Sequence, residues 1–238
     1  NGEIYNHKIL QQENEFIMKS DSDCEIIIPM YEKYGIEKTI KSLDGVFAFI
    51  LHDKLENKTM IGRDPYGVRP LFIGKTKNNE LLICSEIKPI KPMCVHIEPF
   101  EIGSYSILDN DSMVIKYQRY HNYDFTFNND SEEEIKEKIR SLFVQAVNKR
   151  LMSDRPIGCL LSGGLDSSLV SALVAKNYAP YTLNTFSIGM KGSTDLHYAN
   201  MAAKHIKSNH HNIELTNEDF LEAIAETIYM IESYDITT

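Results

Sequence analysis

The stretch PIGCLLSGGLDSS, residues 156–168, decides the fold of the second half of this sequence. It begins with an apolar run that predicts a short buried strand, and it continues into SGGLDSS, which marks the turn into a helix. Segments that predict strands and helices then alternate, which is typical of an α/β domain with a doubly wound parallel sheet. We expect strands over 156–161, 183–189 and 211–215 and helices over 168–176, 195–206 and 218–231.

The loop over 162–168 has the composition of an anion site. Glycines let a backbone approach an anion closely, and the start of a helix supplies amide donors and the positive end of its dipole. The hydroxyls of Ser162, Ser167 and Ser168 add donors for phosphate oxygens, while Asp166 can hold a magnesium ion that bridges such oxygens. A plain turn needs neither so many hydroxyls nor the acid. The loop has no lysine, unlike a Walker loop, so release of pyrophosphate fits it better than transfer of a γ-phosphate.

Other residues in this half also invite a functional interpretation. Because ligands sit at the carboxyl ends of parallel strands, we expect chemistry in the loops after Leu161 and Ile188. Asp195 follows in the segment GSTD, where it either faces the nucleotide loop or caps the next helix. A histidine group straddles a helix end and a strand start without a carboxylate at ligand spacing, so a metal site there is not favoured. This group comprises His205, His210 and His211.

The first half of the sequence is dominated by short β-rich runs separated by turn residues. A helix over 23–34, with apolar residues at three-to-four spacing, suits packing on the resulting sheet, which predicts a layered α+β domain. Arg63, Asp64 and Arg69 could be site residues, but an Arg-Asp pair in a tight turn between strands more often braces the backbone, and we favour that structural interpretation. Strands are expected over 46–52, 59–62, 69–74, 80–85, 103–109 and 113–117.

The clearest break in composition is the polar, acidic stretch 128–134. It contains an S-x-x-E capping box that begins at Ser131, and the helix that follows carries apolar residues at helical spacing. We therefore place the domain boundary here, with one domain over 1–126 and another over 130–238.

Composition narrows the classes of protein. The 238 residues are 42% hydrophobic and 25% charged, as in a globular protein, and the net charge of −9 argues against nucleic acid as the main partner. The longest apolar stretch, Val46–Leu51, is far too short to span a membrane, and no signal-peptide pattern is present. The 4 cysteines form no CxxC pair, which fits a reducing compartment. We expect a cytoplasmic protein.

The sequence SGGLDSS after an apolar strand resembles the pyrophosphatase loop of the N-type ATP pyrophosphatases, which activate a carboxylate or carbonyl by adenylation. With LMSDRPIGCL before it, TFSIGMKGSTDL over 185–196 and IESYDITT over 231–238, it resembles the synthetase domain of the glutamine-hydrolysing asparagine synthetase family. The resemblance implies ATP as a substrate and Mg²⁺ held by Asp166 through pyrophosphate. The implied ATP-binding residues are Leu161, Ser162, Gly163, Gly164, Leu165, Asp166, Ser167, Ser168 and Ile188, with Leu161 and Ile188 acting through their backbone.

Three segments of the first half resemble the class II glutaminase domain of the Ntn-hydrolase type. They are NGEIYNH over 1–7, SDCE over 22–25 and GRDPYGVRPLF over 62–72. The resemblance implies that the Asn1 side chain and the Gly2 amide form the oxyanion hole for the γ-carbonyl of glutamine. It implies that Glu3 and Asp23 hold the substrate, and a carboxylate facing an α-ammonium group is physically reasonable. Without its companions, NGE would be interpreted as a hairpin turn.

Several parts of the family pattern find no match in this sequence. The family nucleophile is an N-terminal cysteine, which Cys24, Cys84, Cys94 and Cys159 do not match in position, so none of them is assigned to catalysis. The glutamine-clamping arginine, expected upstream, and the downstream adenylation residues are also unmatched. We therefore expect an internal fragment that is inactive by itself.

The implied activity is ATP-dependent synthesis of asparagine from aspartate with ammonia derived from glutamine. It proceeds through β-aspartyl-AMP and releases AMP and pyrophosphate. The implied partners are small molecules, with no nucleic acid and no membrane, and a homodimer is left open. Two alternatives stay open as well. One is a related adenylating ligase, for instance a β-lactam-forming one, without a working glutaminase, and the other is a catalytically silent nucleotide-binding protein.

Overall fold

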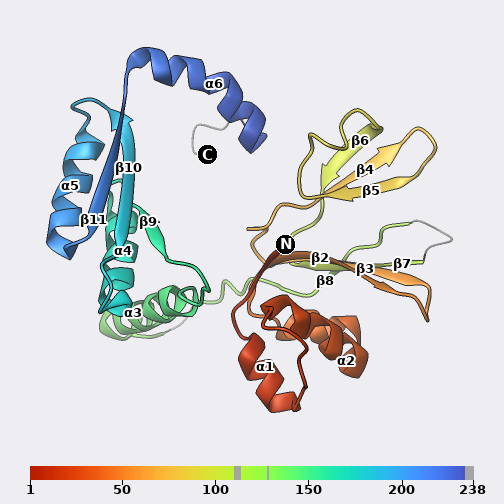
Figure 1. The fold of residues 1–238 in the computed structure, drawn as a ribbon. Coiled ribbons are helices and arrows are strands. Elements are labelled where there is room, and N and C mark those ends of the chain that lie inside the picture. Colours follow the sequence, from red (N-terminus) through yellow and green to blue (C-terminus); the bar gives the residue numbers. More distant parts are fainter. Residues whose placement is uncertain (110–113, 128, 234–238) are drawn as a thin grey trace. The chain divides into compact units, whose positions relative to one another are not determined.

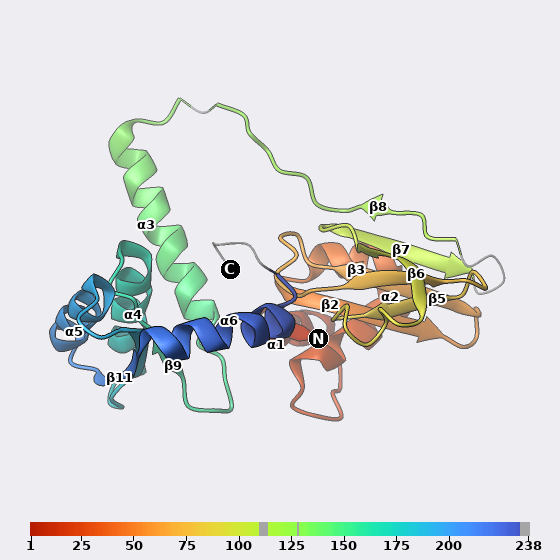
Figure 2. The ribbon, with the colours of Figure 1, turned by 90° about the horizontal axis from the view of Figure 1, so that it is seen from above.

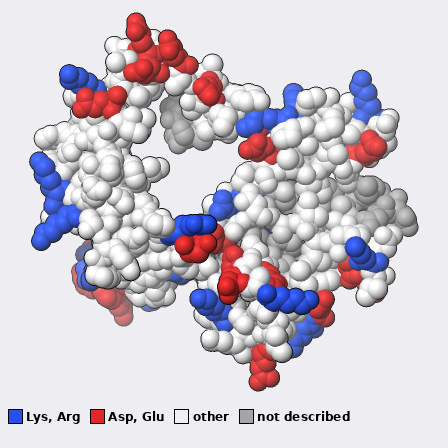
Figure 3. All heavy atoms as spheres, in the orientation of Figure 1, with Lys and Arg blue, Asp and Glu red and all other residues white. Residues whose placement is uncertain are grey.

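The computed structural model describes residues 1–109, 114–127 and 129–233, and the chain divides into two compact units, Asn1–Thr126 and Phe127–Thr238 (Figure 1). Among the residues that the structure describes, no helix combines the length and the apolar character needed to cross a membrane. On the face shown in Figure 3, acidic and basic side chains are interspersed within each unit.

The first unit is built on a 5-stranded antiparallel sheet of order β1-β2-β3-β7-β8, and β8 lies beside β7 at its edge (Figure 2). A smaller sheet of order β5-β4-β6 is also antiparallel. The strands are β1 (Gly2–Ile4), β2 (Gly45–Asp53), β3 (Lys58–Arg63), β4 (Phe72–Thr76), β5 (Leu81–Cys84), β6 (Cys94–Pro99), β7 (Ser104–Asp109) and β8 (Gln118–Arg119). The helices are α1 (His7–Asn14), a 3₁₀ turn η1 (Asp23–Ile26) and α2 (Ile27–Ser42).

Alternation along β2 explains how this unit forms two cores. Phe47 contacts the helices through a cluster that includes Ile26 and Ile40, while its neighbour Ala48 contacts a second cluster with Phe100 on the opposite face. Successive side chains of a strand point to opposite faces, so both faces of β2 are buried in this region. α1 and α2 therefore cover one face of the larger sheet (Figure 1).

Two expectations for the first unit were wrong in detail. The expected helix over 23–34 begins as the 3₁₀ turn η1 and continues as α2 to Ser42, across non-helical backbone at Gly35. The expected strand over 113–117 is not formed in 114–117, and residue 113 lies outside the described residues. The strand that pairs with β7 is β8, which begins at Gln118, one residue after the end of the expected strand, in the register Ser104↔Arg119 and Tyr105↔Gln118.

The second unit contains a 3-stranded sheet of order β11-β10-β9 in which all pairs are parallel, as the alternation predicts. Its strands are β9 (Gly158–Leu160), β10 (Asn184–Met190) and β11 (Asn209–Leu215), and its helices are α3 (Glu132–Lys149), α4 (Leu165–Tyr178), α5 (Thr194–Ile206) and α6 (Asn217–Ile231). The capping box at Ser131 is confirmed, because its side chain accepts from the Glu134 amide and the Glu134 side chain accepts from the Ser131 amide.

Candidate functional site

The loop over 162–168 begins where the chain leaves the parallel sheet. Leu161 is only 1% exposed, and its amide donates to the Phe186 carbonyl of β10 at 2.7 Å. Ile188 lies further along β10 and is 61% exposed. β9 and β10 run parallel. The loop that follows Leu161 and the residue Ile188 therefore lie at the same edge of the sheet, the edge at which the strands end.

Gly163 has a conformation and a contact that only glycine accommodates. Its φ is +82°, and an added Cβ would lie 2.4 Å from the backbone nitrogen of Ala199 on α5. A side chain at this position would therefore meet backbone and not a flexible side-chain end. The loop is thus held directly against α5.

The first turn of α4 presents donors that its own side chains do not consume. Its N-cap is Gly164, which has no side chain that could accept hydrogen bonds from the first backbone amides of the helix. These amides carry the positive end of the helix dipole. Ser162 and Ser167 hydroxyls lie 2.9 Å apart, and the Gly164 amide donates to Ser162 at 3.4 Å. Asp166 is exposed in the same turn. The loop therefore groups amides, hydroxyls and one carboxylate, the donor set that a magnesium-bound polyphosphate needs.

We predict that Gly163→Ala destabilises the second unit by about 2–4 kcal/mol, the sum of left-handed strain and overpacking. The measurement is denaturant unfolding of the chain. Gly164→Ala is the matched control, because φ is negative there and an added Cβ would meet only Ser162 Oγ, at 3.5 Å. Equal stability of the two variants would contradict this account of the loop.

In the first unit, Asn1, Gly2 and Glu3 lie along and beside β1. Gly2 pairs with Phe47 and Glu3 with Val46 of β2, so this segment is a strand and not a hairpin turn. An added Cβ at Gly2 would lie 2.2 Å from the Val46 carbonyl oxygen, which leaves room only for glycine. The Asn1 carbonyl accepts from the Ala48 amide at 2.9 Å, and its side-chain amide donates to Ser85 at 3.5 Å.

Asp23 is hydrogen-bonded to β1 although it lies 19 residues further along the sequence than its partner, Ile4. Its Oδ2 accepts from the Ile4 amide at 2.6 Å, which places the start of η1 beside β1. The structure therefore places Asp23 beside the strand segment that carries Asn1, Gly2 and Glu3, so that backbone amides and two carboxylates occur in one patch. Such a patch can hold a small molecule that carries both a carbonyl and an ammonium group. The patch comprises Asn1, Gly2, Glu3 and Asp23.

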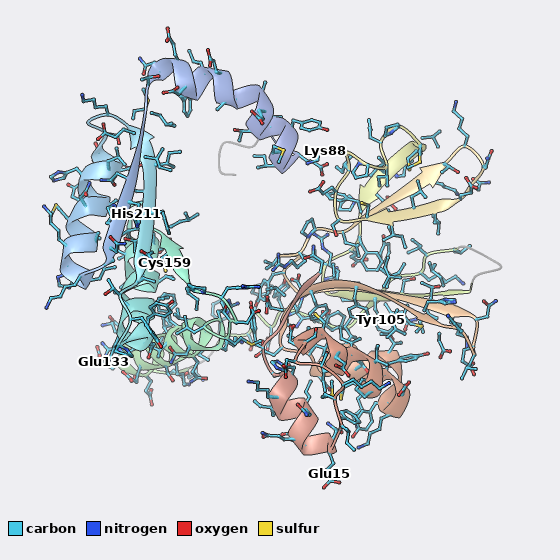
Figure 4. The ribbon with its side chains drawn as sticks, viewed as in Figure 1. Glu15, Lys88, Tyr105, Glu133, Cys159 and His211 are labelled. Atoms are coloured by element: carbon cyan, nitrogen blue, oxygen red, sulfur yellow. The ribbon has the colours of Figure 1, made fainter. Side chains whose placement is uncertain are left out.

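The four cysteines are free thiols. Cys24 lies 3.9 Å from the Gly2 carbonyl oxygen, and burial together with the charge of Asp23 raises the pKa of its thiol. Burial likewise raises the pKa of Cys159 on β9, which is labelled in Figure 4. Both thiols are thus held in the neutral form, which is the weaker nucleophile.

We predict that Cys24 is alkylated by iodoacetamide at pH 8 more slowly than a free cysteine, because its raised pKa leaves less thiolate at that pH. Mass spectrometry of the peptides after timed quenching measures the rate. The urea-unfolded chain is the control, in which the 4 cysteines should react at similar rates. A Cys24 that reacts as fast folded as unfolded would contradict the prediction.

Arg63 and Asp64 brace a turn, as interpreted from the sequence. The Arg63 guanidinium donates to the carbonyls of Arg69, Gly67 and Phe100 at 2.7–3.1 Å. The buried Asp64 carboxylate accepts backbone amides on both sides of the turn. Its donors are the amides of Phe47, Tyr66, Val68 and Arg69.

The structure shows which contacts Asp195 and the histidines make, and so bears on the interpretations left open from the sequence. The N-cap of α5 is Ser193, which accepts from the Leu196 amide at 3.4 Å, so Asp195 lies in the first turn and does not cap. His210 bonds to hydroxyls of β10, and His211, labelled in Figure 4, stacks on Phe186 with ring centroids 5.1 Å apart. Within the described part of the chain, no group of 3 or more His, Cys, Asp or Glu side chains could hold a metal ion.

Sequence reasoning missed the part of α5 that supports the loop. Tyr198 and Ala199 contact the position of Gly163, and Ala199 is fully buried. The run of small residues in ANMAAK, 199–204, is the signal that could have indicated a close approach of another backbone.

The fold defines the class: a mixed α/β chain whose first unit groups amides and carboxylates at β1 and whose second unit groups amides, hydroxyls and a carboxylate at the start of α4. Residues 1–123 match the family described as glutamine amidotransferase domain, and residues 138–238 match the family described as asparagine synthase. The chain therefore belongs to the glutamine amidotransferase domain family, and its amidotransferase segment is followed by an asparagine synthase segment.

The relatives carry both segments. The chain is 45% identical to "Asparagine synthetase [glutamine-hydrolyzing]" of Rattus norvegicus, over 100% of this chain and 47% of that protein. The proteins of the same description from Homo sapiens and Gallus gallus are 44% and 42% identical, with the same coverage. The chain thus spans about half the length of the curated relatives it matches. A solved structure, "Structure of the allosteric regulatory enzyme of purine biosynthesis", aligns with a TM-score of 0.46 and 15% identity over 90% of this chain and 58% of that chain.

Proposed function

We propose that this chain is part of an enzyme that makes asparagine from aspartate, with ammonia taken from glutamine and with ATP as the activating substrate. One observation carries the proposal: the donor set of an adenylating loop stands at the start of α4 in the same chain as the amide-and-carboxylate patch on β1. The family matches and the relatives support it.

The proposal assigns the nucleotide to the second unit. The phosphates of ATP would accept from the amides of the first turn of α4 and from the hydroxyls of Ser162, Ser167 and Ser168. The backbone at Leu161 and Ile188 would contact the adenylate. The β-carboxylate of aspartate attacks the α-phosphorus, the bond to the bridging oxygen breaks, and pyrophosphate leaves.

The loop fits magnesium as well as phosphate. Asp166 is exposed in the first turn of α4, within the group of serine hydroxyls, and an oxygen ligand beside phosphate is what Mg²⁺ prefers. The ion would offset the charge that develops on the departing pyrophosphate. Asp166 would hold it through pyrophosphate oxygens.

The proposal assigns glutamine to the first unit. The Asn1 side chain and the Gly2 amide would donate to the oxygen that becomes negative when the γ-carbonyl is attacked. Glu3 and Asp23 would face the α-ammonium group, and the bond from the Ile4 amide fixes Asp23 for this task. The attacking thiol, which in the family is an N-terminal cysteine, is not assigned to any of the 4 cysteines of this chain.

Finer features belong to the same proposal. The first unit is an Ntn-hydrolase-type layered domain over 1–126, and the second is a doubly wound ATP-pyrophosphatase domain over 130–238. The enzyme works in the cytoplasm on small molecules, with no nucleic acid or membrane partner, and a homodimer fits the proposal.

Transfer of labelled nitrogen tests this function. The full-length protein is incubated with aspartate, ATP, Mg²⁺ and glutamine labelled with ¹⁵N at the amide. We expect ¹⁵N in the side-chain amide of asparagine. Labelled ammonia without asparagine would mean that only the first unit works, and no turnover of either substrate would favour a silent nucleotide-binding protein.

A further inference from the structure

A chain of polar side chains runs between the parallel sheet and α5. Thr185 and Ser187 lie on one face of β10 and are 0% and 8% exposed. Opposite them on β11 lie His210 and Asn212, in the register Thr185↔His210 and Ser187↔Asn212. Successive bonds join Ser208 to Thr185 (2.7 Å), Thr185 to His210 Nδ1 (2.8 Å), His210 Nε2 to Ser187 (3.2 Å), Ser187 to Asn212 Oδ1 (2.5 Å) and Asn212 Nδ2 to Asn200 Oδ1 on α5 (3.1 Å).

The donors of this chain can be ordered from one end. Asn200 Nδ2 donates to the Leu196 carbonyl, and Asn212 Nδ2 donates to Asn200, so Asn212 Oδ1 is the acceptor for the Ser187 hydroxyl. Ser187 has then used its single proton, and it must accept from His210 Nε2. His210 Nδ1 lies 2.8 Å from the Thr185 hydroxyl, and the direction of that bond depends on the tautomer. His210 therefore donates from Nε2 and contacts a hydroxyl of β10 through each of its two ring nitrogens.

This chain ends on the helix that supports the nucleotide loop. Asn200 is adjacent to Ala199, whose backbone nitrogen would lie 2.4 Å from a Cβ at Gly163. The apolar cluster shared by α5 and the start of the loop has three buried members, Leu161, Ala199 and Ala203, with Ala202 and Ile206 packed against it. Three of these five side chains are alanines, which bury little apolar surface, so polar bonds add to the positioning of α5.

We propose that His210 is a positioning residue for nucleotide binding: its imidazole ties β10 and β11 to Asn200 of α5 and thereby holds the backbone against which Gly163 rests. The inference rests on the proposed function, because it deepens the role of the loop over 162–168. His210 itself touches no nucleotide, so it acts only through α5.

The first test measures the affinity of the 238-residue chain for ATP with Mg²⁺ by calorimetry. His210→Leu fills the space but removes both bonds, and we expect the Kd to rise about tenfold. His210→Gln supplies one acceptor and one donor, and it should restore affinity to within about threefold of the unchanged chain. His211→Leu is the matched control: the ring of His211, next to His210 in the sequence, stacks on Phe186, and the Kd should stay within about twofold.

Hydrogen exchange supplies a second readout that does not depend on ATP. In His210→Leu, the amides of α5 and of residues 162–168 should exchange faster, while those of α4 after its first turn should not. Ser187→Ala breaks the same chain between His210 and Asn212, and it serves if His210→Leu does not fold.

Each outcome has a distinct meaning. Unchanged affinity and unchanged exchange in His210→Leu would overturn the inference, and so would a His210→Gln variant as weak as His210→Leu. An unchanged chain that binds no ATP would contradict the proposed function instead, and the exchange over 162–168 would then decide the inference alone.

Discussion

Replacing Asp166 by Asn in the full-length protein is expected to abolish aspartate-dependent release of pyrophosphate and to leave glutamine hydrolysis unchanged. The substitution keeps the size of the side chain and its place in the first turn of α4, but it removes the charge that would hold magnesium. A metal ion contributes several kcal/mol of charge stabilisation in the transition state, so we expect a loss of at least about a hundredfold.

Two measurements separate this effect from misfolding. Pyrophosphate release is followed with aspartate and ATP, and glutamate release is followed with glutamine alone. Asp154→Asn is the matched control, since that carboxylate is 90% exposed in the loop before β9 and should leave both activities intact. Full asparagine synthesis by Asp166→Asn would refute the assigned role.

Replacing Asn1 by Ala is expected to lower synthesis driven by glutamine while synthesis driven by free ammonia stays unchanged. The Asn1 side-chain amide would donate to the oxyanion that forms on glutamine, and free ammonia forms no such oxyanion. The loss of one such donor typically lowers the rate by about 10²- to 10³-fold. The backbone of Asn1, which pairs with Ala48, is retained in the variant.

The comparison of nitrogen donors is internal to the experiment, because both assays use one preparation. Asn78→Ala, in the exposed turn between β4 and β5, is a further control that should affect neither assay. An equal loss with both donors would show that Asn1 acts through the stability of the fold.

Features of the candidate site that depend on neighbouring residues could be predicted from the sequence. The loop over 162–168 follows its strand directly in the sequence. Its glycines and serines are the residues that a backbone close to an anion needs, so both the position and the chemistry of the loop could be inferred. The capping box at Ser131 is local in the same way. The parallel pairing of β9, β10 and β11 followed from the alternation of segments.

Features that depend on residues far apart in the sequence could not be predicted in this way. The bond from Ile4 to Asp23 and the contact of α5 with Gly163 need the tertiary fold. α1 was missed because it is only 8 residues long, mostly polar and buries only Leu10, so it offers too few apolar positions to indicate a helix. The cap of α5 was unclear because Ser193 and Asp195 are both common capping residues and only geometry distinguishes them.

The most direct test of the central claim follows oxygen from aspartate. The full-length protein is given aspartate labelled with ¹⁸O in its β-carboxylate, together with ATP, Mg²⁺ and glutamine. If the carboxylate attacks the α-phosphorus at the loop over 162–168, one labelled oxygen must appear in AMP for each asparagine formed. AMP without the label, or ADP and inorganic phosphate in place of AMP and pyrophosphate, would contradict the account.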